Sequence, residues 1–204
     1  MKKILVIGAT GQIGSALMTK LRKEYGNDNV VAGYIEGVPL SDELKNGGPL
    51  EIADVTNAQQ FAAIIDKYKI DSIYNLAAIL SAQAEKRPLL AWNIQIGGVL
   101  NLLEISREKG CSLFTPSSIG AFGDSSPKMK TPQETIQRPR TIYGVSKVSC
   151  ELLSDYYFYR YGVDTRSVRF PGLISYETLP EKYTTPPSRA RSSRFRSRRG
   201  HSWI

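Results

Sequence analysis

The sequence predicts an α/β fold in which helices cover both faces of a doubly wound parallel sheet. Short apolar runs that end at Gly or Asp alternate with segments whose apolar residues recur every three or four positions. The first apolar run, residues 3–7, leads into a glycine-rich turn that opens a helical segment. Strands that alternate with helices form right-handed βαβ units, so we expect a parallel sheet with strand order 3-2-1-4-5-6.

The elements follow one another with no internal repeat and no linker before about residue 180. Short runs rich in apolar and β-branched residues predict strands at 3–7, 29–35, 50–56, 71–78, 111–118 and 163–170. Helical spacing of apolar residues predicts helices at 11–26, 57–68, 88–109 and 142–162. Gly97 and Gly98 should weaken the middle of the third helix. Residues 123–140, rich in Pro, Gly and polar residues, should form a loop.

Glycines at positions 8, 11 and 14 form the sequence GATGQIG between the first strand and the first helix. This context is typical of Rossmann-type dinucleotide sites, because the glycines let the backbone approach a pyrophosphate and the helix N-terminus offers unpaired N–H groups. The alternative is a tight strand-to-helix turn without a ligand. The residues expected to bind the dinucleotide here are Gly8, Gly11, Gln12, Ile13 and Gly14.

The ends of the next strands indicate which dinucleotide is bound. An Asp or Glu usually meets the adenosine ribose at the end of the second strand, where this sequence has Tyr34, with Glu36 two residues further on. No Arg or Lys stands nearby to receive a 2′-phosphate, so the sequence favours NAD over NADP. Asp54 closes the third strand, where its carboxylate either accepts from the adenine amino group or caps the helix at Asn57.

Four further residues are expected to contact the cofactor, besides Tyr143 and Lys147, which are described below. Val55 follows Asp54, and Leu76, Ala77 and Ala78 end the fourth strand. Small residues at a strand end allow a cofactor to pass close by, although core packing is an equal alternative.

Tyr143 and Lys147 lie four residues apart in YGVSK, one turn apart on the same face of the predicted helix. If they form a proton-transfer pair, the phenol, whose ordinary pKa is about 10, must ionise near neutrality. An ammonium one turn away in a dry cleft would lower the phenol pKa. The alternative is an ordinary amphipathic helix with a Tyr at its margin and a Lys that extends to solvent.

Taken together, these motifs resemble a known family. GATGQIG, NLAA, PSSIGAFG and YGVSK, in this order, resemble the extended short-chain dehydrogenase/reductase family, within the NAD-dependent epimerase/dehydratase superfamily. The strings AAILSAQAEKRPLLAWNI, TIQRPRTIYGVSK and YGVDTRSVRFPGLIS are similar to the NAD-dependent L-threonine 3-dehydrogenases of that family. The likeness runs from Lys2 to about Thr185. The C-terminal substrate domain that the family implies does not follow, so we expect this domain to be truncated.

The resemblance implies roles for single residues. Tyr143 would be the catalytic acid/base, Lys147 would support it and bind the nicotinamide ribose, and Ser118 would hold the substrate hydroxyl. Ser117 is the alternative to Ser118. The residues expected to contact the substrate are Ser81, Ser118, Thr135, Tyr143 and Thr185. For Ser81 and Thr135, a side chain that only caps a loop is the alternative.

The reaction that the resemblance implies is the oxidation of L-threonine to 2-amino-3-ketobutyrate with NAD as cofactor. Without the substrate domain we expect this activity to be impaired. One alternative is a nucleotide-sugar epimerase or dehydratase, which shares the cofactor and the Tyr-Lys pair. Another is a catalytically silent NAD-binding protein. The family also implies a homodimer that pairs through helices 88–109 and 142–160.

Composition excludes several other classes. With 41% hydrophobic and 23% charged residues, the chain has the balance of a soluble globular protein. The first apolar run is too short for a signal peptide, so we expect a cytoplasmic protein without a membrane partner. Cys111 and Cys150 lie far apart and should be buried free thiols. The sole histidine, His201, leaves no His-based triad and no multi-His site, so no metal is expected.

The positive charge is concentrated at the end of the chain. Residues 183–204 contain six arginines and no Asp, Glu or Lys, and these arginines account for six of the eight net charges. We expect residues 1–182 to form the dinucleotide-binding domain. Residues 183–204 should be a disordered Arg/Ser-rich tail, because they hold too few apolar residues to offset the entropy of ordering. Nucleic acid is expected as a partner only through this tail, and an accidental read-through end is the alternative.

Overall fold

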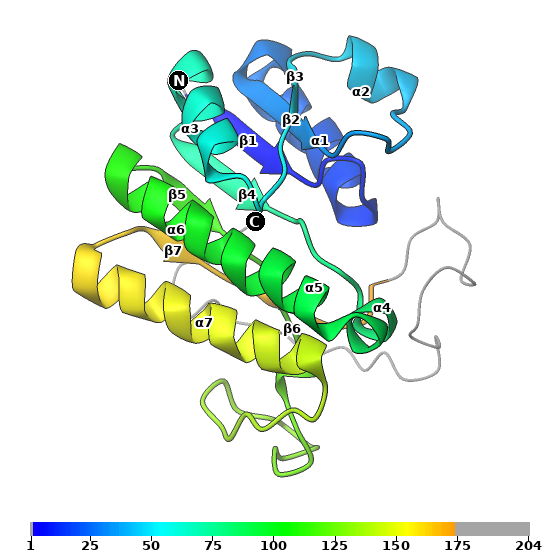
Figure 1. The fold of residues 1–204 in the computed structure, drawn as a ribbon, viewed down its shortest axis with the longest axis vertical. Coiled ribbons are helices and arrows are strands. Elements are labelled where there is room, and N and C mark those ends of the chain that lie inside the picture. Colours follow the sequence, from blue (N-terminus) through cyan, green and yellow to red (C-terminus); the bar gives the residue numbers. More distant parts are fainter. Residues whose placement is uncertain (1, 174–204) are drawn as a thin grey trace.

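The structure, a computed structural model, describes residues 2–173, which form a parallel sheet with helices on both faces (Figure 1). The order of its six strands is β3-β2-β1-β4-β5-β7. They are β1 Ile4–Ile7, β2 Val30–Tyr34, β3 Leu50–Ile52, β4 Ser72–Asn75, β5 Ser112–Phe114 and β7 Thr165–Arg166. Every pair of neighbours is parallel. Because β7 is the sixth strand of this sheet along the chain, the predicted doubly wound fold and the order 3-2-1-4-5-6 are confirmed.

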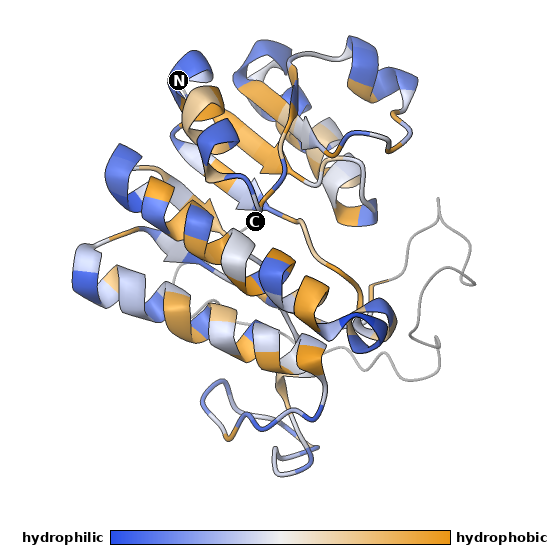
Figure 2. Cartoon of the chain, viewed as in Figure 1, coloured by the Kyte–Doolittle hydropathy of each residue, from blue (hydrophilic) through white to orange (hydrophobic). Residues whose placement is uncertain are grey.

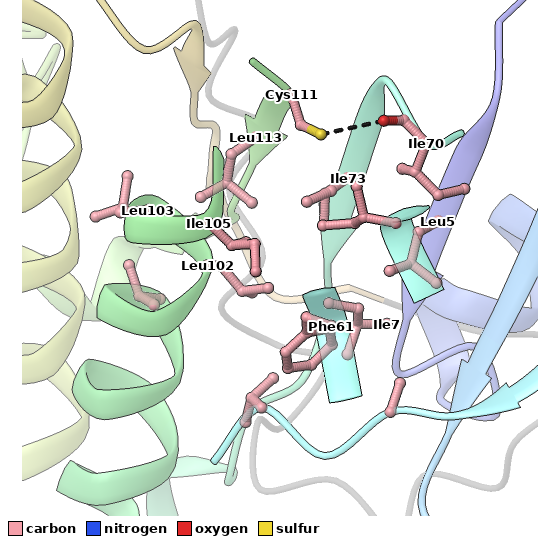
Figure 3. Packing of buried hydrophobic residues seen from close by; sticks show 14 of the residues in the cluster. Leu5, Ile7, Phe61, Ile70, Ile73, Leu102, Leu103, Ile105, Cys111 and Leu113 are labelled. Atoms are coloured by element: carbon pink, nitrogen blue, oxygen red, sulfur yellow. Dashed lines mark hydrogen bonds between the residues drawn. The ribbon is translucent and has the colours of Figure 1, made fainter. Parts of the chain in front are cut away.

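Strand β1 is at the centre of the sheet and is buried on both of its faces. Leu5 and Ile7 belong to a core cluster with residues of α3 (Ala58–Tyr68), α6 (Gly98–Lys109) and α7 (Ile142–Tyr161), part of which is drawn in Figure 3. Ile4 and Val6 point the other way and pack in a second cluster with residues of α1 (Gln12–Tyr25) and α2 (Asp42–Asn46). Successive side chains of a strand face opposite sides, so a strand that is covered twice reads as a continuous apolar run.

The helix expected at 88–109 forms as three joined pieces. They are α5 Pro88–Trp92, the π-helical turn η2 Asn93–Gly97, and α6. The irregular turn ends at the two glycines that were expected to weaken the helix. A Cβ on Gly98 would lie 2.7 Å from the Cβ of Val55, so this glycine lets the helix approach the segment after β3.

By length and composition, Pro88–Lys109 could also cross a membrane, with a mean hydropathy of 1.2 over its most apolar window. Half of that window is buried inside the domain, and core helices of soluble proteins pass the same test, so this is weak evidence for a span.

Figure 2 shows that the central strands are hydrophobic, while helices such as α2 are mostly hydrophilic.

The strands expected at 111–118 and 163–170 each divide into two. β5 and β7 stay in the main sheet, whereas β6 Ser117–Ser118 and β8 Arg169–Phe170 pair with each other in a separate two-stranded sheet. Pro116 precedes β6 and has no N–H to donate to a ladder, which accounts for the break in the first strand. The short 3₁₀ helix η3, Ile119–Ala121, follows β6.

Several short helices were not predicted. They are the 3₁₀ turn η1 Asn27–Asn29, α2, η3 and α4 Ser81–Lys86. Each is six residues or shorter, which is too short for apolar periodicity to show. The expected loop at 123–140 contains no helix or strand, and α7 begins directly after it, capped by the Thr141 hydroxyl, which accepts from Gly144 N.

The two cysteines are free and buried, as expected. Cys111 Sγ donates to the Ile70 carbonyl (Figure 3), and Cys150 Sγ to the carbonyl of Gln95. Within residues 2–173, no group of three or more His, Cys, Asp or Glu side chains could hold a metal ion. The expected domain boundary at residue 182 and the expected disorder of residues 183–204 lie outside the described residues.

Candidate active site

The glycine turn lies at the carboxyl end of β1, between β1 and α1. Gly8 has a φ of +79°, a conformation that other residues rarely adopt, and Gly8 N and Ala9 N each donate to the Gly33 carbonyl of β2 at 3.0 Å. A Cβ on Gly14 would lie 2.1 Å from the Gly8 carbonyl oxygen. The turn can therefore fold back against the start of α1 only because Gly8 and Gly14 are glycines.

Helix α1 presents a free N-terminus beside this turn. Its N-cap is Gly11, which has no side chain to cap the first N–H groups, and the first turn contains no acidic residue. The uncapped N–H groups and the positive end of the helix dipole suit a pyrophosphate. The structure thus brings the five predicted residues, Gly8, Gly11, Gln12, Ile13 and Gly14, into one turn that fits this part of a dinucleotide.

The segment after β4 touches the same turn. A Cβ on Gly8 would lie 3.1 Å from the Leu76 carbonyl carbon and from Ala77 N. Leu76 N donates to the Ile7 carbonyl at 2.9 Å, and Ala77 N donates to Asn75 Oδ1 at 3.2 Å. Leu76, Ala77 and Ala78 therefore flank the glycine turn at the carboxyl ends of β1 and β4, where ligands of such sheets bind.

The residues predicted to lie near the adenosine differ in what the structure shows of them. Tyr34 is the half-buried last residue of β2, and Glu36 is exposed in the turn that follows. Asp54 Oδ1 accepts from the backbone N–H and the hydroxyl of Thr56, whereas Asn57 caps α3. The alternative role of Asp54 as the helix cap is therefore wrong. Val55 is buried in the core cluster, so packing accounts for this residue.

Tyr143, Lys147 and Ser118 come together from α7 and β6. The Ser118 side chain hydrogen-bonds the Tyr143 phenol, and its Oγ also accepts from Gly120 N at 3.1 Å. Lys147 Nζ lies 5.5 Å from the centroid of the Tyr143 ring. The three predicted catalytic residues therefore form one cluster.

The electrostatics of this cluster differ from the prediction. Burial raises the pKa of Tyr143, and the hydrogen bond from Ser118 lowers it only in part. Burial lowers the pKa of Lys147, whose ammonium donates to the Pro116 carbonyl at 2.9 Å. The pKa of Tyr143 is therefore raised rather than lowered as expected, because the effect of burial outweighs that of the hydrogen bond from Ser118. The phenol is therefore protonated near neutral pH.

The two candidate serines have different hydrogen-bond partners. Ser117 is buried, and its hydroxyl donates to Glu151 Oε1 at 2.5 Å, while Ser118 is the serine in contact with Tyr143. Of the two candidates, only Ser118 contacts the phenol, and its role toward a substrate hydroxyl stays a prediction.

The remaining substrate candidates lie on two different segments. Ser81 is the first residue of α4, directly after the N-cap residue Leu80. Glu85 of the same helix accepts from Ile142 N at 2.8 Å, which holds α4 to the start of α7, next to Tyr143. Thr135 is half-buried in the loop at 123–140. Thr185 lies outside the described residues.

Sequence reasoning missed three charged residues around the cluster. They are Glu85, Glu151 and Arg169, of which Glu151 and Arg169 form a buried ion pair. One signal was present in the sequence. Glu151 lies four residues after Lys147, on the helix face that carries the Tyr-Lys pair, and a carboxylate on a buried face needs a partner.

Residues 4–194 match the sequence profile of the NAD dependent epimerase/dehydratase family. The chain belongs to this family. The match confirms the resemblance to the extended short-chain dehydrogenases. Because the family is described as NAD-dependent, it also confirms NAD as the cofactor, in agreement with the turn described above.

Relatives within the family are described as dehydrogenases, as epimerases or as epimerase/dehydratases. An uncharacterized epimerase/dehydratase from Staphylococcus haemolyticus is 55% identical over 185 residues, which are 91% of this chain and 58% of the relative. The L-threonine dehydrogenase of Clostridium difficile is 57% identical, with a TM-score of 0.82 over 88% of this chain and 56% of that one. The UDP-glucose 4-epimerase of Thermotoga maritima is 25% identical, with a TM-score of 0.75 over 82% and 54%. This chain therefore spans little more than half the length of these relatives.

Proposed function

We propose that this chain contributes the NAD-binding and proton-transfer part of an L-threonine 3-dehydrogenase. The observation that carries the proposal is the cluster of Tyr143, Ser118 and Lys147, built on the same fold as the glycine turn. A buried phenol that is hydrogen-bonded to a serine can serve as the positioned acid/base group that removes a proton from a secondary alcohol. The likeness to an L-threonine dehydrogenase over 88% of this chain supports L-threonine as the alcohol.

Each residue has a separate part in this reaction. The glycine turn and the N-terminus of α1 would hold the pyrophosphate, and Lys147 would bind the nicotinamide ribose. Ser118 would orient the C3 hydroxyl of the substrate, and Tyr143 would take its proton. NAD, when bound, supplies the acceptor for the hydride that leaves C3. Because burial keeps the Tyr143 phenol protonated, Tyr143 must first lose its own proton to solvent before it acts as a base, and the Lys147 ammonium, 5.5 Å from the centre of its ring, would favour the ionised form.

The test compares two proteins. One is the present chain, and the other is this chain fused to the C-terminal part of the C. difficile L-threonine dehydrogenase that the alignment leaves uncovered. We expect NADH to form from millimolar L-threonine and NAD only in the fused protein. Ser81, Ser118 and Tyr143 supply one wall of a site, and positioning by the other wall is worth up to about 7–11 kcal/mol. A folded, NAD-binding fused protein without threonine-dependent NADH would contradict the proposal.

A second candidate function is nucleotide-sugar epimerisation. The likeness to a UDP-glucose 4-epimerase favours it, and the family itself is described as epimerase/dehydratase. The same proteins should be incubated with UDP-glucose and the products separated by chromatography. Conversion of UDP-glucose without threonine-dependent NADH would favour this candidate. A protein that binds NAD and turns over neither compound would be a silent NAD-binding protein.

We also propose that the chain forms a homodimer through α5 and α7. These helices expose large apolar side chains, with Leu89 86%, Leu152 61% and Tyr159 83% accessible. Sedimentation velocity should show a dimer that Leu152→Glu converts to a monomer. Ile136→Glu, at an exposed apolar position in the loop at 123–140, is the matched control and should leave the dimer intact. The cytoplasmic location remains a prediction.

A further inference from the structure

We propose that Glu151 and Arg169 are positioning residues, whose buried ion pair holds strand β6 against α7 and so keeps Ser118 on Tyr143. The catalytic consequence rests on the function proposed above, whereas the positioning itself concerns only the contacts of this chain. Neither residue contacts the phenol; both are proposed to act through Ser117 and the strand that carries Ser118.

The ion pair has a single defined geometry. Arg169 Nε donates to Glu151 Oε1 at 2.8 Å, and Arg169 Nη2 donates to Oε2 at 2.7 Å. The two side chains are only 4% and 7% exposed. A two-point contact between a guanidinium and a carboxylate fixes direction as well as distance. The pair therefore sets how α7, which carries Glu151, lies on β8, which carries Arg169.

Strand β6 is attached to this pair by both side chain and backbone. The Ser117 hydroxyl donates to Glu151 Oε1, and Ser117 lies opposite Arg169 in the β6–β8 ladder. Three successive residues of this segment thus meet α7 on one face. Pro116 accepts from Lys147, Ser117 donates to Glu151, and Ser118 contacts Tyr143. Residues 143, 147 and 151 are one helical turn apart, so a shift of β6 would change all three contacts together.

The same pair also holds the loop at 123–140. Arg169 Nη1 donates to the Gln133 carbonyl at 2.8 Å, and Gln137 Nε2 donates to Glu151 Oε2 at 3.2 Å. Thr135, a candidate substrate contact, lies between these two attachment points. The ion pair thus connects the catalytic helix, the serine strand and this loop.

Stability alone is a weak explanation for such a pair. Removing two charges from water costs about as much as their attraction returns, and well-packed apolar residues of similar volume are often as stable. Burial alone would raise the pKa of Glu151, but the hydrogen bonds from Arg169 and Ser117 lower it below its usual value. Glu151 is therefore ionised at neutral pH, and its oxygens accept from three side chains. The ion pair fixes the orientation of α7 relative to β8, which apolar packing alone does not fix.

The test measures the titration of the Tyr143 phenol by NMR in the full chain, with ¹³C labels in the tyrosine rings. The signal of Tyr143 is assigned as the one that Tyr143→Phe removes. The variants are Glu151→Gln and Ser117→Ala. Because the hydrogen bond from Ser118 lowers the pKa of Tyr143, loosening β6 should move its titration upward in both variants. Glu104→Gln is the matched control, since Glu104 accepts from Tyr157 of α7 away from Ser118 and should leave the titration unchanged.

Catalysis in the fused protein is the second measurement. Both variants should lower kcat, by up to about 10²-fold if the reacting groups move by an ångström, with little change in the KM for NAD. An unchanged Tyr143 titration in folded Ser117→Ala would overturn the positioning role, and this variant decides the matter if Glu151→Gln does not fold. A shifted titration in a fused protein that never oxidises threonine would keep the positioning role and remove only the proposed substrate.

Discussion

The glycine turn and the segment at residues 116–118, here called the catalytic segment because of its proposed role, are built from different kinds of contact. Within the turn the contacts are between near neighbours in sequence, since Gly14 packs against Gly8 and Ala9, and the rest of the sheet holds the turn through the backbone of Gly8 and Ala9. The catalytic segment depends on α7, because Pro116 meets Lys147 31 positions later and Ser117 meets Glu151 34 positions later. A local motif therefore specifies the first region, whereas the second exists only once β6, β8 and α7 have packed together.

The two regions should also respond differently to change. The turn is limited by space, because any side chain at Gly14 would overlap the Gly8 carbonyl. The catalytic segment tolerates little change in the orientation of its polar groups, because they are buried and each has a specific partner. Four predictions test this contrast, taken in order of decreasing expected effect.

The largest effect should come from Tyr143→Phe in the fused protein. Loss of the phenol removes the proposed acid/base group, so turnover should fall by about 10²–10⁴-fold. NAD affinity should change little, because the glycine turn is intact. Initial rates of NADH formation and calorimetric titration with NAD measure the two quantities. Tyr156→Phe, at an exposed position of the same helix, is the control. Near-normal rates in Tyr143→Phe would show that another group moves the proton.

Gly14→Ala should weaken NAD binding next most strongly. The new Cβ would lie 2.1 Å from the Gly8 oxygen, and such overpacking costs about 1–3 kcal/mol. If that strain displaces the turn, the NAD dissociation constant should rise by about 10- to 100-fold. The control is Gly110→Ala, because Gly110 has a φ of +72° with no neighbour within 4 Å of a Cβ. It should cost stability without changing NAD binding, and normal NAD affinity in folded Gly14→Ala would contradict the space argument.

The buried thiols should make stability fall at alkaline pH. Burial raises the pKa of both Cys111 and Cys150 from 9.0 to about 11. The unfolded chain therefore loses these protons first. The stabilisation is complete below pH 9 and is lost as pH rises through 11. Urea midpoints measured between these pH values should decline less steeply when both cysteines are replaced by serine. An identical pH dependence in that variant would rule the thiols out as the cause.

Tyr34→Asp should have the smallest effect. A carboxylate at the end of β2 can accept from the adenosine ribose hydroxyls, and a hydrogen bond to a charged group is worth about 1.5 kcal/mol or more, roughly tenfold in affinity. Calorimetry should show tighter NAD binding and no gain for NADP, while Tyr34→Asn, without the charge, should gain less. The unchanged chain should already prefer NAD, and equal or tighter NADP binding would contradict the interpretation of this strand end.

Most of the fold could be predicted from the sequence because its signals are local. The apolar run at Ile4–Ile7, the glycine turn and the long helix α7 each show their structure within a few neighbouring residues. Pro116 is a local signal for the break in the first of the two divided strands, but the pairing of β6 with β8 could not be predicted, because it depends on which strand lies beside which. The short helices α2 and α4 are held by contacts such as that of Glu85 with Ile142, which no local pattern contains.

The sequence by itself determined the sheet, its strand order, the dinucleotide turn and the spacing of Tyr143 and Lys147, because these follow from periodicity and from where glycine is needed. Only the tertiary structure decided which groups those residues contact and how their pKa values shift. It placed Lys147 on a backbone carbonyl, selected Ser118 over Ser117 for the phenol, and buried Tyr143 so that its pKa rises. Burial and long-range partners set these properties, since a pKa depends on every group that packs around the site and the sequence specifies only the order of residues along the chain.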